Sequence, residues 1–177
     1  MFNHFLRILH HHWIGESAAR RAVPPALAER LARQVAESEA RHGGEIRLCI
    51  EGGLPASYLW RHVWQRTPIE TLARQRAAMM FAKLRVWDTE ANNGVLIYVL
   101  LAAHHVEIVA DRGISRHVPP EEWQAMIGRL SQSFAQSQIE QGLLQAVADV
   151  GAALERHFCL PPGQVKSNEL PDAPVIV

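Results

Sequence analysis

Acidic, amide and basic side chains gather at two points that flank a pair of apolar stretches. Asp88, Asn92 and Asn93 precede the first stretch, and Asp111 and Arg112 follow the second. If the two stretches pair as a β-hairpin, both groups lie at the same end of it. Carboxylate and amide oxygens suit Ca²⁺ or Mg²⁺, so Asp88, Asn93 and Asp111 are candidate metal ligands.

A second interpretation of the same residues needs no ligand. Asn92-Asn93-Gly94 and Asp111-Arg112-Gly113 are both typical of turns, and an aspartate beside an arginine commonly forms a surface ion pair. In the metal interpretation, Arg112 would contact a phosphate group. The sequence contains no nucleophile and base at a recognisable spacing, so it assigns no catalytic residue, and both interpretations stay open.

The apolar stretches themselves predict two neighbouring strands. Gly94–Leu101 is continuously apolar and rich in branched residues, which is typical of a strand covered on both faces. His105–Asp111 alternates apolar and polar side chains, as a half-buried strand does. With residues 103–104 at the tip of the hairpin, Gly94 is expected opposite Gly113.

The remaining elements are indicated by periodicity and by helix punctuation. One further strand is expected at Glu45–Glu51, where apolar residues alternate. Apolar residues at helical spacing, with prolines near several starts, predict helices over roughly 25–42, 68–86, 120–136 and 139–154. Helices and strands that alternate in this way predict an α/β domain with helices on both sides of the sheet.

The length of 177 residues fits one domain with short extensions. We expect an N-terminal docking segment at 1–22, the domain at 23–160, and a flexible Pro-rich tail at 161–177. The chain shows no leader peptide and no apolar run long enough to span a bilayer, so a cytoplasmic location is expected, with peripheral membrane contact as the alternative.

The net charge and three aromatic residues indicate which class of partner the chain binds. Lysine plus arginine equals aspartate plus glutamate, at 18 each, so no overall field favours nucleic acid. Tyr58, Trp60 and Trp64 lie close together between a strand and a helix, where such rings would be good anchors for a protein partner. Burial of these rings in the core is the alternative.

The hairpin segments also resemble a known family. Asn93-Gly94-Val95-Leu96-Ile97, followed by the segment Val106–Ile114, is similar to the TPM-domain family, over roughly Glu45–Phe158. The family turn commonly carries Asp-Arg where this chain has Ala103-His104. The resemblance implies a three-layer α/β/α sandwich around a small mixed β-sheet.

The resemblance also implies functions. Members have been credited with acid phosphatase activity and with calcium binding, and bacterial relatives often accompany LemA-like membrane proteins. Because no complete catalytic set is present, we expect a non-catalytic binding or assembly module with a membrane-associated protein partner. A divalent-cation-dependent phosphomonoesterase is the alternative hypothesis.

Overall fold

The computed structural model describes residues 17–161, 163–164 and 166–177. Most of the predicted N-terminal docking segment lies outside these residues. Its last part, 17–22, is helical, and Ala19 and the following Val23 are buried in the core. Residues 17–22 therefore pack on the domain.

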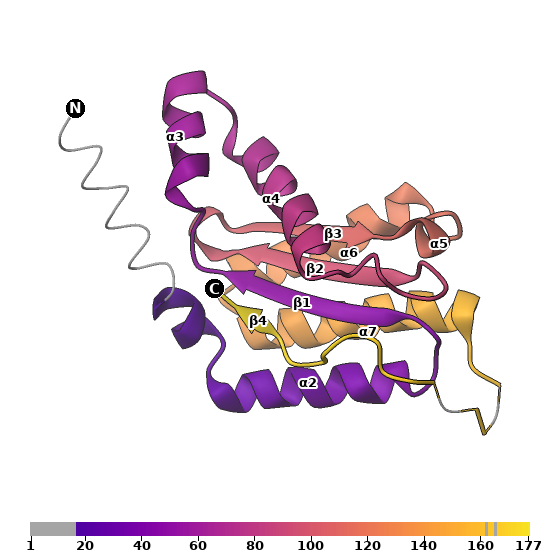
Figure 1. Ribbon diagram of the computed structural model, residues 1–177. Coiled ribbons are helices and arrows are strands. Elements are labelled where there is room, and N and C mark those ends of the chain that lie inside the picture. The colour runs from indigo at the N-terminus through magenta and orange to yellow at the C-terminus, as the bar shows by residue number, and fades with distance from the viewer. Residues whose placement is uncertain (1–16, 162, 165) are drawn as a thin grey trace.

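A mixed sheet forms the centre of the molecule (Figure 1). Its strands stand in the order β3-β2-β1-β4, with β1 parallel to both of its neighbours and β3 antiparallel to β2. The strands are β1 at Glu45–Glu51, β2 at Gly94–Leu100, β3 at His105–Ala110 and β4 at Val175–Ile176. All residues of β1 and β2 are buried, as the continuous apolar run of β2 predicts.

Helices cover both faces of this sheet, so the predicted three-layer sandwich is confirmed (Figure 1). Odd and even residues of the strands supply two separate cores, because side chains of a strand alternate between faces. Ile46, Leu48 and Ile50 face one helical layer, and Leu96 and Leu100 face the other. The first layer consists of α2 at Pro25–Glu39, α6 at Pro120–Ala135 and α7 at Ile139–Phe158; the second consists of α3 at Ala56–Gln65 and α4 at Ile69–Lys83.

The register of the hairpin differs from the prediction. A short 3-10 helix, Leu101–Ala103, forms the turn together with His104, which has a left-handed backbone with φ of 48°. The turn is therefore longer than predicted, and Asp111, instead of Gly113, lies opposite Gly94, to whose carbonyl oxygen its N–H donates at 2.9 Å. The shift is two residues, so every side chain keeps its predicted face.

The C-terminal end of the chain also differs from the prediction of a flexible tail. Val175 and Ile176 form β4, and Leu170 is buried in the core under α4. The tail lacks the periodicity of a long strand because only two of its residues join the ladder. The tail is attached by side chains distant in the sequence, so its composition alone wrongly predicts a flexible segment.

Candidate functional site

Helix α3 presents an exposed aromatic surface. It projects beyond the end of the sheet, and none of its ten residues is buried (Figure 1). Trp60 and Trp64 are 53% and 68% exposed, their rings stack with centroids 5.1 Å apart, and Val63 beside them is half exposed. Positions i, i+3 and i+4 lie on one side of a helix. We call Trp60, Val63 and Trp64 the α3 face.

The opposite side of α3 fastens the helix to α4. The Arg61 guanidinium donates to Oε1 of Gln75 at 2.9 Å, and the guanidinium of Arg76 lies 5.7 Å from the centroid of the Tyr58 ring. Tyr58, predicted as a partner contact together with the tryptophans, is thus half buried on this inner side. The α3 face is held outward by these contacts.

One exposed basic residue, Arg66, directly follows helix α3. Between residues 52 and 83 the chain has five basic residues, Arg61, Arg66, Arg74, Arg76 and Lys83, and one acidic residue, Glu70, but Arg76 is buried against Glu51 and Arg74 pairs with Glu107. The whole chain is neutral, so this excess is local. Such a combination of apolar and basic surface is complementary to an acidic surface with apolar anchors.

A buried ion pair between Arg76 and Glu51 connects α4 to β1, and Arg76 also contacts Tyr58 of α3. The Nε of Arg76 donates to both oxygens of Glu51, at 2.9 and 3.1 Å, and the hydroxyl of Tyr98 donates to the same carboxylate at 2.7 Å. Burial raises the pKa of Tyr98, so its hydroxyl stays protonated and remains a donor. Burial also raises the pKa of the neighbouring Cys49 thiol to about 12, which excludes a reactive thiolate there.

The predicted metal ligands have separate local partners. Asp88 is exposed and paired with Arg85 at 2.6 Å, whereas Asn93 is buried and donates from Nδ2 to the carbonyl oxygen of Gly43 at 3.1 Å. Asp111 accepts from the N–H of Arg112 at 2.6 Å and so caps α5, Arg112–Ser115. Within the described part of the chain, no group of three or more histidine, cysteine, aspartate or glutamate residues could hold a metal ion.

The strand register decides how Asn93 and Asp111 are placed. Residues opposite each other in paired strands share a face, so Asp111 shares the face of Gly94, and Asn93 points to the other face. Asn93 Oδ1 and Asp111 Oδ2 are both buried without a hydrogen-bond partner among the described residues. Arg112, the predicted phosphate ligand, lines a cavity of about 320 Å³ together with Asn92, Gly113 and Arg116.

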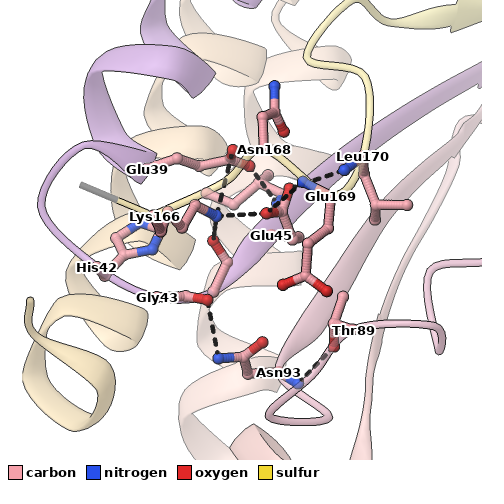
Figure 2. Close-up of polar contacts among 12 residues, drawn as sticks. Glu39, His42, Gly43, Glu45, Thr89, Asn93, Lys166, Asn168, Glu169 and Leu170 are labelled. Carbon is pink, nitrogen blue, oxygen red and sulfur yellow. Dashed lines mark hydrogen bonds and ion pairs between the residues drawn. The ribbon is translucent and has the colours of Figure 1, made fainter.

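A further polar cluster was not predicted. Lys166 extends between Glu39 and Glu45 at the start of β1 (Figure 2). Its Nζ donates to Oε1 of Glu45 at 2.5 Å and to the carbonyl oxygen of Gly44 at 2.7 Å, and lies 3.6 Å from Oε2 of Glu39. Glu45 is fully buried. No motif marks this cluster, because Lys166 lies 121 residues from Glu45 in the sequence.

Two groups of this region have shifted pKa values. Burial is the main cause that raises the pKa of Glu39 to about 8, and the charge of Glu45 acts in the same direction. Burial also lowers the pKa of His42 to about 4, reinforced by the charge of Lys166. Folding therefore favours a protonated Glu39 and a neutral His42 at neutral pH.

These shifts predict that the protein loses stability as pH rises above 6.5. A raised carboxyl pKa means that the folded state keeps a proton that the unfolded state releases, so Glu39 opposes folding increasingly up to its folded pKa of about 8. His42 acts in the opposite direction, but only below its unfolded value of 6.5. Between pH 6.5 and 8 the free energy of unfolding should fall by up to about 2 kcal/mol because of Glu39.

Denaturation with urea at several pH values measures this effect. Glu39→Gln should flatten the slope between pH 6.5 and 8, since an amide does not titrate and can still accept the hydrogen bond from the N–H of Ile46. Glu37→Gln, on the exposed side of the same helix, should leave the slope unchanged. Equal slopes for the two variants would show that Glu39 titrates normally.

Comparisons with known proteins agree with this architecture. A family model described as "TPM domain" matches residues 19–153. The solution NMR structure of BA42 protein from the psychrophilic bacterium Bizionia argentinensis has the same fold, with a TM-score of 0.69 and 24% sequence identity over 86% of this chain and 94% of that chain. No curated protein matches the chain. None of the helices in the described residues combines the length and hydropathy that a membrane span requires.

Proposed function

Since the chain belongs to the TPM-domain family, we propose that it is a non-catalytic member that binds a protein partner through the α3 face. The observation that carries this proposal is the exposure of Trp60, Val63 and Trp64 on a helix without a single buried residue. Two stacked tryptophans present a large rigid surface, and tryptophan is among the residues that contribute most at interfaces. A helix kept outward by Arg61 would be preorganised for binding.

The charge near the α3 face indicates which chemical class of protein partner it would bind. The exposed Arg66 at the end of α3 favours an acidic segment that carries apolar anchors. A membrane-associated protein of the LemA-like kind is the first candidate, and it would place this protein in the cytoplasm at the membrane periphery.

Affinity capture from native lysate tests the proposal. The full chain should retain one protein whose amount falls sharply when Trp60 and Trp64 are both replaced by serine. Identification of that protein then gives the partner for quantitative work. A chain that is monomeric and retains no protein dependent on the two tryptophans would refute the proposal.

A second candidate function is a phosphomonoesterase that depends on Ca²⁺ or Mg²⁺. The observation in its favour is Asp111, whose Oδ2 is buried without a partner among the described residues, beside Arg112 and its cavity. In this function Asp88 and Asp111 would hold the ion without Asn93, which points to the other face, and Arg112 would bind the phosphate. The ion would supply a polarising positive charge at the phosphoryl oxygens.

This candidate predicts that millimolar Ca²⁺ or Mg²⁺ raises the melting temperature. At an ion concentration of about 100 times Kd the folded state gains about 2.7 kcal/mol, which corresponds to about 5–10 °C for a chain of this length. Asp111→Asn should abolish the shift, whereas Glu90→Gln, at an exposed position nearby in sequence, should not. The absence of both a shift and turnover of an aryl phosphate would eliminate this candidate.

A further inference from the structure

The C-terminal segment, which we define as residues 166–177, completes the sheet from outside the family-matched region. The match with the TPM domain ends at residue 153. Without this segment, the described sheet would consist of β3, β2 and β1, and β1 would be an edge strand. The segment covers that edge by backbone pairing: the N–H of Val177 donates to Ile50 at 2.9 Å, and the N–H of Gly52 donates to Val177 at 2.8 Å.

Two side chains anchor the C-terminal segment. Lys166 enters the space between the carboxyl groups of Glu45 and Glu39 (Figure 2), and Leu170 is buried in the core with residues of α4. One basic anchor and one apolar anchor on an extended backbone are the features by which proteins recognise peptides.

Side chains of the domain also form hydrogen bonds with the backbone of the C-terminal segment. Glu45 accepts hydrogen bonds from the N–H groups of Glu169 and Leu170, at 3.2 and 3.3 Å. Arg47, in the middle of β1, donates to the carbonyl oxygens of Pro171 and Ala173. These two side chains of β1 bind the backbone of the segment directly, in addition to the strand pairing of Val175 and Ile176.

We propose that the edge of β1, together with Glu39 and Glu45, is a binding site for an extended segment that carries a lysine. This chain fills the site with its own residues 166–177, and the same segment of a second copy can enter it once the first is released. The site is separate from the α3 face, since it lies along the edge of β1 whereas the α3 face is on a helix. In the intact chain the covalent link gives the internal segment a high effective concentration, so it excludes a competitor.

A labelled synthetic peptide with the sequence of residues 164–177 tests the proposal by fluorescence anisotropy. The peptide is titrated with three full-length chains: the wild type, Lys166→Ala, and Val177→Pro. Lys166→Ala removes the basic anchor, whereas Val177→Pro keeps all charges and removes only the N–H that pairs with Ile50. Each variant weakens the internal segment, so each should bind the intact peptide at least about tenfold more tightly than the wild type does.

Two specificity controls complete the experiment. A peptide with alanine in place of its lysine should bind the variants at least about tenfold more weakly, and adding Glu45→Gln to Val177→Pro should weaken the intact peptide by a similar factor. The proposal is overturned if folded variants bind the peptide no better than the wild type, or bind the alanine peptide equally well. It is also overturned if both variants lose all structure in circular dichroism, because the segment is then an inseparable part of the fold.

Discussion

Replacing Arg76 by methionine should lower the free energy of unfolding by about 3–5 kcal/mol, because it leaves the carboxylate of Glu51 buried without its cation. The side chains of Arg76 and Glu51 are only 10% and 2% exposed. Methionine fills a similar volume but donates no hydrogen bond, so the three hydrogen bonds that Arg76 donates to Glu51 are lost. Among the described residues, the hydroxyl of Tyr98 remains as the one side-chain donor to that carboxylate.

A matched control lies two residues away on the same helix. Arg74 is 76% exposed and approaches Glu107 at 3.4 Å, and exposed ion pairs contribute less than about 1 kcal/mol. Arg74→Met should therefore change the free energy of unfolding, measured with urea, by no more than this. If Arg76→Met has an equally small effect, the Glu51 carboxylate must find another partner, and the described support of α3 and α4 is wrong.

Replacing Trp64 by alanine should weaken binding of the captured partner by about 2–4 kcal/mol, or roughly 30-fold to 1000-fold in Kd. Trp64 is the most exposed large apolar residue of the described chain, and its removal also deprives Trp60 of its stacking neighbour. Because the ring is exposed, the free energy of unfolding should change by less than about 0.5 kcal/mol. Isothermal titration calorimetry with the purified partner measures the loss.

Trp87→Ala provides the control for this prediction. Trp87 is half exposed but lies after α4, outside the α3 face. If any exposed tryptophan contributed to binding through nonspecific adhesion, Trp64→Ala and Trp87→Ala would weaken binding equally. Such a result would contradict a specific role for α3.

The sequence predicts three of the four described strands and most helices because their apolar periodicity is local. β1 has the bounds that alternation at Glu45–Glu51 predicts, and β2 ends one residue before the predicted limit of its apolar run. The resemblance to the TPM-domain family, carried by Asn93–Ile97 and the strand after it, is confirmed by the family match. Both signals depend on short stretches of contiguous residues.

Features that depend on distant contacts could not be predicted. Helix α3 has no stripe of buried residues, so its sequence does not show which side faces the domain. The aromatic residues predict anchors for a protein partner, but not that Tyr58 faces inward while Trp60 and Trp64 face outward. The predicted hairpin register failed because nothing in Leu101–His104 reveals a 3-10 turn. The site in which Lys166 meets Glu39 of α2 and Glu45 of β1 exists only once the two ends of the domain come together.

The central claim, that the α3 face binds a protein partner, is tested most directly by photo-cross-linking in cells. A photoreactive amino acid at Val63, between the two tryptophans, should yield one discrete adduct, which Trp64→Ala should abolish. The same amino acid at Gly128, an open position on α6 in the opposite helical layer, should yield none. The absence of an adduct at position 63, or the same adduct at both positions, would contradict the claim.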